Sequence, residues 1–209
     1  MDQLEWEKSL IPKNMIAARE NFPQLTPKEY FAWEEKQLEK HEYIEGQVYA
    51  MSGGSRNHSL IAVRFTTLFS NHLDGSSCDV GNSDLRVKIV KTENYTYPDI
   101  SVTCDDRDKT TTQYITYPSL IVEVLSPSTE AYDRGGKFRL YSNNPLLQDY
   151  LLVSSTSIEI DLYHKKDNGE WIIINYKEGD MIELKSINLT FAIAQIYRGL
   201  TLAPEEELR

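Results

Sequence analysis

The chain has 209 residues, of which 40% are hydrophobic and 26% charged, and its formal net charge is -10. This length is enough for one domain with a substantial hydrophobic core. No segment approaches the ~18 apolar residues of a membrane-spanning helix, and the first residues lack the apolar stretch of a signal peptide. The composition therefore predicts a soluble, cytoplasmic protein. The negative charge disfavours broad affinity for nucleic acid, because non-specific binding depends on Lys and Arg displacing counterions from phosphates.

The two cysteines, Cys78 and Cys104, have no metal-ligand spacing and form no recognisable disulfide framework. In a cytoplasmic protein such residues are reduced by default. We therefore expect two free thiols with no role in the chemistry.

The first predicted helix covers residues 27–39. Thr26 is a good N-cap, Pro27 fits the first helical position, and Glu29 completes a capping box. A short hairpin is expected next, because apolar and polar residues alternate around Gly46.

Ser55 is the expected N-cap of a second helix, within the sequence RNHSLIAVRFTTLFSNHL. Its apolar residues recur at helical spacing and predict a wide face directed at the core. These residues are Leu60, Ile61, Val63, Phe65, Leu68 and Phe69.

Three strand-like segments follow, and the last of them, 119–126, is almost entirely apolar, as a strand buried on both faces should be. The other two are residues 84–90 and 95–104. Further along, the pattern predicts a helix over 130–143 and a strand over 149–154. A hairpin whose turn contains Asn168 and Gly169 is expected next, followed by one more strand and a solvated tail from Ala203. The order indicates an α/β protein with a single domain over 1–209, a core at about 55–154, and peripheral segments at 1–25 and 203–209.

Two carboxylates stand out in these strands. Glu123 interrupts the buried run, and Asp99 follows Pro98 inside another strand-like segment, although proline and aspartate are both disfavoured in strands. If the two segments pair with Asp99 beside Glu123, the carboxylates repel each other unless one is protonated or a cation lies between them. An oxygen-only site favours Mg²⁺ or Mn²⁺ over zinc, and such a metal supports phosphodiester hydrolysis. The alternative is that Glu123 pairs with a buried Lys or Arg while Asp99 only caps a turn.

The order of these elements resembles the PD-(D/E)xK nuclease superfamily, and more narrowly the Uma family of bacterial restriction-endonuclease-like proteins. The resemblance rests on HEYIEGQVYAMSGGSRNHSLI, YPDISV, LIVEVLSPST and DRGGKFRLY, in that order, and extends from about Tyr30 to Leu189. It implies a restriction-endonuclease-like core of αβββαβ order, with an N-terminal helix and hairpin and C-terminal hairpin additions. It also implies two acidic residues and a lysine that together hold a divalent metal and orient water.

The lysine departs from the superfamily pattern, because position 125, two residues after Glu123, is leucine. The Uma resemblance implies a lysine supplied by the following helix, which matches Lys137. Asp133, Lys137 and Tyr141 are spaced four residues apart and are expected to share one helix face. The alternative is an ordinary surface pair between Asp133 and Lys137, with little energetic weight.

Two further residues match family positions. His58, near the start of the second helix, could orient water or a carboxylate, or simply serve as a hydrogen-bonding helix end. Glu42 matches an acidic position before the turn and is a further candidate ligand, whereas Glu45 is expected to be exposed.

The resemblance thus predicts a metal-dependent endonuclease that acts on nucleic acid, with DNA as the first candidate substrate, and that assembles as a homodimer. Asp99 and Glu123 would bind Mg²⁺ or Mn²⁺, and Lys137, His58 and Glu42 would complete the site. The acidic charge and the missing lysine at position 125 favour an alternative, an inactive binding or regulatory protein that has kept the fold. A third reading places the acidic pair in an ion-pair network between subunits.

Overall fold

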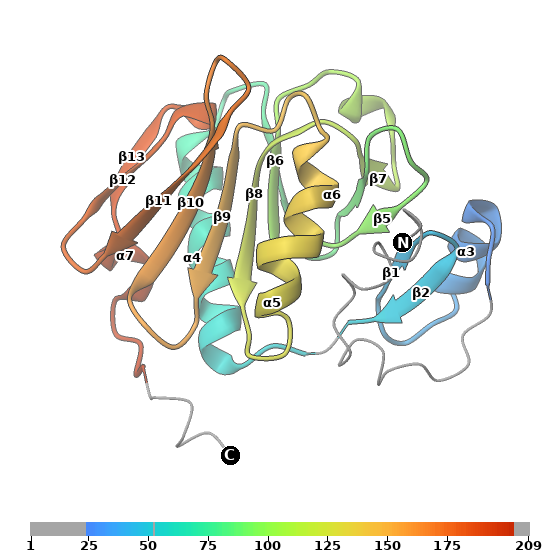
Figure 1. The fold of residues 1–209 in the computed structure, drawn as a ribbon, viewed down its shortest axis with the longest axis horizontal. Helices are drawn as coiled ribbons and strands as arrows, with labels where there is room; N and C mark the ends of the chain where they lie inside the picture. The colour runs from blue at the N-terminus through green and yellow to red at the C-terminus, as the bar shows by residue number, and fades with distance from the viewer. Residues whose placement is uncertain (1–23, 52, 203–209) are drawn as a thin grey trace, which may run out of the picture.

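The computed structural model describes residues 24–51 and 53–202 of the chain. The strands form a five-stranded sheet in the order β2-β1-β5-β4-β7, a six-stranded sheet in the order β11-β10-β9-β8-β6-β3, and a separate β12-β13 hairpin. Figure 1 shows the six-stranded sheet at the centre, with α4 behind it, α5 and α6 in front, and the β1–β2 hairpin with α3 to one side. The expected single domain has peripheral segments that lie largely outside the described residues.

The six-stranded sheet contains one parallel pair of strands among antiparallel ones. The strands are β3 (Asp79–Asn82), β6 (Ile100–Thr103), β8 (Pro118–Leu125), β9 (Asp149–Ser154), β10 (Glu159–Lys165) and β11 (Trp171–Lys177). β8 and β9 run parallel, and all other pairs are antiparallel, so the sheet is mixed. This confirms the predicted α/β class with a mixed central sheet flanked by helices.

The smaller elements complete the fold. They are β1 (His41–Ile44), β2 (Gln47–Ala50), β4 (Arg86–Lys88), β5 (Tyr95–Thr96), β7 (Tyr114–Ile115), β12 (Met181–Leu184), β13 (Leu189–Ala192) and α7 (Ala194–Tyr197), with single 3₁₀ turns at Asp108–Thr110 and Lys185–Ile187. In the described ranges, no helix has the length and apolar character needed to cross a bilayer.

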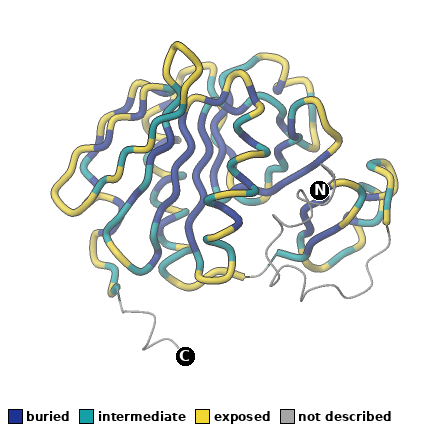
Figure 2. Tube along the Cα trace, in the orientation of Figure 1, coloured by how far each residue is buried: buried dark blue, intermediate teal, exposed yellow. Residues whose placement is uncertain are grey.

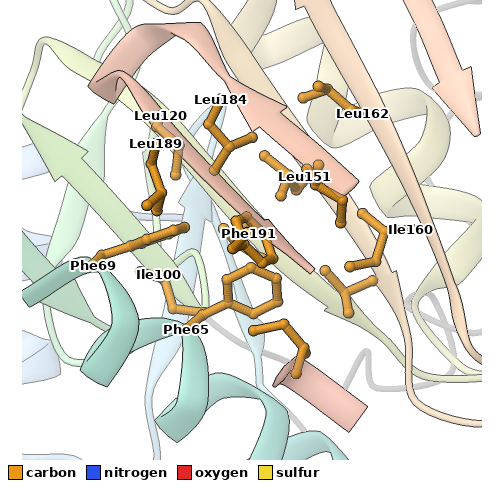
Figure 3. Close-up of a cluster of buried hydrophobic side chains, with 14 of the residues drawn as sticks. Phe65, Phe69, Ile100, Leu120, Leu151, Ile160, Leu162, Leu184, Leu189 and Phe191 are labelled. Atoms are coloured by element: carbon orange, nitrogen blue, oxygen red, sulfur yellow. The ribbon is translucent and has the colours of Figure 1, made fainter. Parts of the chain in front are cut away.

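One face of the central sheet packs on α4 (Arg56–His72), on the β12–β13 hairpin and on α7. Phe65 and Phe69 of α4 point toward Phe191 of β13 and the side chains of the sheet (Figure 3). The strands of the central sheet are buried along most of their length (Figure 2). Val63, predicted as part of the apolar face of α4, is instead 58% exposed.

The other face packs on one helical stretch composed of α5 (Glu130–Tyr132), a π-helical turn (Asp133–Lys137) and α6 (Phe138–Ser142). The predicted helix over 130–143 therefore exists, but its centre is π-helical where Gly135 and Gly136 lie. Insertion of a wider turn shifts the side chains that follow it relative to a regular α-helix, and such turns occur often at functional sites.

The first helix, α3 (Pro27–Glu34), begins with the predicted capping box between Thr26 and Glu29. It ends earlier than the predicted residue 39. Leu38 is fully exposed and therefore adds no buried contact that would extend the helix. The hairpin turn at Glu45 and Gly46 has positive φ at both residues, and Glu45 is exposed as expected.

The expectation for the central strands was wrong in one respect. Residues 84–90 provide β4, which pairs with β5 and β7 in the five-stranded sheet, and the outer strand of the central sheet is instead β3. β3 has the sequence DVGN, which carries almost no strand signal. The C-terminal region likewise has two strands, β12 and β13, where one was expected.

The expectation of two free thiols was also wrong, because Cys78 and Cys104 form a disulfide. In the β3–β6 pair, Asp79 lies opposite Thr103, so the next residues outward face each other across the ladder, with Cα atoms 4.0 Å apart. The separation of 26 residues concealed this contact, because β3 was not recognised in the sequence.

Candidate active site

Asp99 lies where the chain passes from one sheet to the other. β5 ends at Thr96 in the five-stranded sheet, and β6 begins at Ile100 in the six-stranded sheet. Pro98 therefore ends the strand, because its nitrogen has no proton to donate to a ladder. The antiparallel register pairs Ile100 with Val122, which places Asp99 beside Glu123 as predicted.

The Asp99 carboxylate is held by its neighbours on two elements. The amide of Val124 donates to Asp99 Oδ2 at 2.7 Å, and His58 Nε2 lies 3.2 Å from the same oxygen. His58 belongs to the first turn of α4, whose N-cap is Ser55. Of the roles expected for His58, the structure shows contact with a carboxylate.

Glu123 is buried near the end of β8, on the face that packs against α6. Its Oε1 accepts a hydrogen bond from the Tyr141 hydroxyl at 3.3 Å and lies 3.0 Å from Lys137 Nζ. The alternation along β8 explains this direction, because Val122 and Val124 point to the opposite face of the sheet.

Lys137 reaches the strands from the end of the π-helical turn. Its Nζ lies 3.0 Å from Glu123 Oε1, 3.2 Å from Glu42 Oε1 and 3.9 Å from Asp133 Oδ1. The lysine is only 6% exposed, so the alternative of an ordinary surface pair with Asp133 does not hold. The Lys137 ammonium is directed at Glu123, as expected, and at Glu42, but from a π-helical turn and not from the regular helix face that was expected.

Glu42 connects the small sheet to this cluster. It lies on β1, is 3% exposed, and its Oε1 accepts a hydrogen bond from the amide of Tyr97 at 3.2 Å. Its ion pair with Lys137 makes it a partner of the lysine. Residues from both sheets and from both flanking helices therefore meet at one point.

These side chains line one cavity of about 230 Å³. Its wall also contains residues that were not predicted from the sequence as part of the site: Tyr49, Tyr97, Ser126, Ser128, Thr129, Tyr132 and Asp133. Only Asp133 had a usable sequence signal, its spacing of four residues from Lys137. The tyrosines come from several elements and have no shared spacing.

The cavity has more carboxylates than cations. Glu42, Asp99, Glu123 and Asp133 line it, with Lys137 and His58 as the only basic side chains among its lining residues. Burial raises the pKa of the Glu123 carboxyl well above its usual value despite the opposing charge of Lys137. The cluster therefore favours the uptake of additional positive charge.

The pKa values of the neighbouring groups are also shifted by burial and by the excess of carboxylates. Burial raises the pKa of Asp133 to about 6. Burial acts to lower the pKa of Lys137, but the charges of Glu123 and Glu42 outweigh it and raise that pKa well above its usual value. Burial also acts to lower the pKa of His58, and the hydrogen bond and charge of Asp99 outweigh it, so this pKa is raised as well.

The donor set fits a hard divalent cation. Asp99 Oδ2 and Glu123 Oε1 carry the hydrogen bonds and ion pairs, and no hydrogen bond from the described residues reaches the second oxygen of either carboxylate. Those same residues contain no group of three His, Cys, Asp or Glu side chains arranged to hold a metal by themselves. Mg²⁺ needs no such group, because it is typically held by one or two carboxylates and keeps several waters.

A mixed sheet between helices, with an acidic cavity at the strand ends, agrees with the restriction-endonuclease-like fold that was expected. The model of the Uma2 family, described as “Putative restriction endonuclease”, matches residues 27–195. The chain belongs to the Uma2 family.

The chain is also similar to two proteins of a cyanobacterium and, in its fold, to one solved structure. The chain is 70% identical to the “Uncharacterized protein slr1290” of Synechocystis sp. (strain ATCC 27184 / PCC 6803 / Kazusa), over 86% of this chain and 94% of the relative. It is 33% identical to the “Uncharacterized protein sll1609” of the same organism, over 71% of this chain and 85% of the relative. The fold is similar to the crystal structure of “a putative nuclease belonging to DUF820” from Anabaena variabilis ATCC 29413. The TM-score is 0.66 at 18% identity, and the match covers 83% of this chain and 97% of the other.

Proposed function

We propose that the protein is a divalent-metal-dependent endonuclease that hydrolyses phosphodiester bonds, with Asp99 and Glu123 as the residues that hold Mg²⁺ or Mn²⁺. The observation that carries this proposal is the position of Lys137 Nζ, 3.0 Å from Glu123, in the cavity that Asp99 also lines. Two carboxylates that can hold a divalent metal, with an ammonium beside them, form a set of groups that supports phosphodiester hydrolysis.

Each residue has a separate role in this proposal. When bound, the metal would lower the pKa of a coordinated water and polarise a phosphoryl oxygen. Lys137 stabilises the negative charge that develops on the phosphate in the transition state. His58 and the Val124 amide fix Asp99 Oδ2, and Glu42 holds the ammonium of Lys137 in place.

The reaction consumes one water. A bond forms between the water oxygen and phosphorus, the bond from phosphorus to one ester oxygen breaks, and the departing oxygen ends with a proton that originates from the water. The products are a phosphomonoester and an alcohol, and no oxidant or reductant is needed.

One observation favours the alternative of an inactive binding or regulatory protein. Lys137 already contacts both Glu42 and Glu123, so the buried cluster is partly neutralised without a metal. A buried lysine that only compensates charge would produce the same contacts. The two functions differ in whether the second carboxylate oxygens accept a cation.

A cleavage assay separates them. Purified protein is incubated with labelled single- and double-stranded DNA and RNA in Mn²⁺ or Mg²⁺, with and without excess chelator. The proposal predicts endonucleolytic products that chelator abolishes and that the Asp99→Ala, Glu123→Gln double variant does not form. Cleavage that persists in the double variant would show that another site or a contaminant is responsible.

The matched control is an Asp167→Asn, Glu170→Gln double variant. Both residues are exposed near the β10–β11 turn. Their substitution removes two carboxylates, as the Asp99→Ala, Glu123→Gln variant does. This control should cleave as the wild type does. DNA as the first substrate, a cytoplasmic location and a homodimer remain proposals, and the dimer is checked by mass measurement in solution.

A further inference from the structure

The candidate active site is the middle of a longer depression. A larger outer cavity of about 630 Å³ shares His58 and Asp99 with the central cavity of about 230 Å³. A third cavity of about 170 Å³ also has Ser126 in its lining. We refer to these three cavities, which share lining residues, as the trough.

The reactive groups lie deep within the trough. Glu123 is 3% exposed and Lys137 is 6% exposed. The phosphates of a duplex lie on the outside of a stiff rod, whose persistence length is about 50 nm. A single strand can bend its backbone into a recess of this kind more readily than a stiff duplex can.

The charges along the trough also favour a single strand. Its basic residues Lys40, Lys137, Arg134 and His58 each contact a carboxylate already, at 2.7 Å, 3.0 Å, 2.5 Å and 3.2 Å respectively. The protein as a whole carries a net charge of -10. A duplex presents one phosphate charge per about 1.7 Å of axis, roughly twice the density of one strand. Repulsion from the acidic surface is therefore weaker for a single strand.

The outer cavity has an apolar surface that a single strand can use. Leu38 is fully exposed, Val63 is 58% exposed, and Met51 and Ala62 lie in the same lining. The exposed faces of unpaired bases can cover such apolar side chains and remove them from water, whereas the bases of a duplex are stacked on one another. The apolar patch is continuous with the active site through His58 and Gly54.

We infer that the substrate is a single-stranded nucleic acid, bound along the trough with the scissile phosphate at Asp99 and Glu123 and a flanking base against Leu38 and Val63. This inference rests on the proposed function of the same site. The trough does not distinguish ribose from deoxyribose, so the experiment includes both.

The test compares labelled 20-nucleotide DNA and RNA as single strands and as blunt duplexes. Binding is measured by fluorescence anisotropy with chelator present, and cleavage is measured in Mn²⁺. The expected result is at least tenfold tighter binding and faster cleavage of a single strand, in either the DNA or the RNA arm. The Leu38→Ser, Val63→Ser variant should lose about tenfold in single-strand affinity, because the apolar surface that the base would cover becomes polar.

The control is an Ile173→Ser, Met181→Ser variant, which removes two similarly exposed apolar residues, 61% and 57% exposed, outside the trough. It should bind as the wild type does. Equal or tighter binding and cleavage of duplex would overturn the inference and leave the nuclease proposal intact. Single-strand binding that depends on Leu38 and Val63 without metal-dependent cleavage would support the trough assignment and contradict the proposed catalysis.

Two further outcomes would overturn the inference. One is the absence of binding to any of the nucleic acids. The other is a lower molecular mass of the Leu38→Ser, Val63→Ser variant in solution with unchanged single-strand affinity, which would assign the apolar patch to contact between copies of the chain.

Discussion

The backbone amide of Val124 donates a hydrogen bond to Asp99 Oδ2 at 2.7 Å. This contact fixes Asp99 to the strand that carries Glu123, although Asp99 itself lies outside β6. The aspartate that follows Pro98 is therefore positioned by the neighbouring strand. The two carboxylates move together if either strand shifts, which is the rigidity that a metal site on adjacent strands requires.

Replacement of Lys137 tests its assigned role. Lys137→Met should lower cleavage by about 10²–10³-fold, the usual effect of removing one group that stabilises the transition state. It should also destabilise the protein by about 3–5 kcal/mol, because Glu42 and Glu123 lose their buried partner. Single-turnover cleavage and urea unfolding measure the two effects.

Two variants make the Lys137 result specific. Lys137→Arg keeps the charge and should recover part of the stability, and Lys166→Met, at an exposed lysine, should change neither quantity. Full activity in a folded Lys137→Met protein would contradict the catalytic role.

Asp133 should make folding stability depend on pH. Its pKa is about 6 in the folded protein and near 3.9 in the unfolded chain. Between these pH values the folded protein keeps a proton that the unfolded chain has released. The contribution of Asp133 to the free energy of unfolding is therefore complete below about pH 4 and is lost as the pH rises through 6. Asp133→Asn should therefore become more stable relative to the wild type as the pH rises from about 4 to 7. Urea unfolding across this range checks it, and a constant difference would show that the Asp133 pKa is not raised.

Gly54 should determine the orientation of His58. A Cβ atom at Gly54 would lie 2.6 Å from His58 Nδ1, so Gly54→Ala must displace the imidazole or the loop. The pKa of His58 is raised by Asp99, and we expect it to fall toward its usual value in this variant. NMR titration measures the pKa directly.

Gly53→Ala is the matched control, because a Cβ there meets no atom within 4 Å. It should leave the pKa of His58 unchanged. Identical titrations in both variants would mean that the ring adjusts freely and that Gly54 does not position it.

The Cys78–Cys104 disulfide should contribute to stability. Its loss in a Cys78→Ser, Cys104→Ser variant should lower the free energy of unfolding by about 2–4 kcal/mol. The midpoint of urea unfolding should shift when reductant is added to the wild type and should stay the same when reductant is added to the variant. Two reactive thiols in the native, unreduced protein would refute the bond.

The central acidic pair could be predicted from the sequence because its signals are local. A glutamate in an apolar strand and an aspartate after a proline each conflict with strand formation, and the conflict marks them. Lys137 could be placed only through the family resemblance, since position 125 gave no lysine. Glu42 had the same basis, and its contact with Lys137 depends on how the two sheets meet.

The features that were mispredicted depend on pairing between distant segments. The strand DVGN has little intrinsic preference for a strand and is defined by its partner β6, so both β3 and the disulfide were hidden. Residues 84–90 have a clear strand pattern, but alternation along one strand does not identify the sheet that it joins. The π-helical turn was likewise not expected, because the sequence suggested only a weakened helix at Gly135 and Gly136.

Calorimetric titration with Mn²⁺, on the wild type and on the Asp99→Ala, Glu123→Gln double variant, measures whether these two carboxylates bind a divalent metal. We expect saturable binding in the wild type, loss of that binding in the variant, and unchanged binding in the Asp167→Asn, Glu170→Gln control. Equal, negligible heats in all three folded proteins would contradict the metal site and would support a protein that has kept the nuclease fold without catalysis.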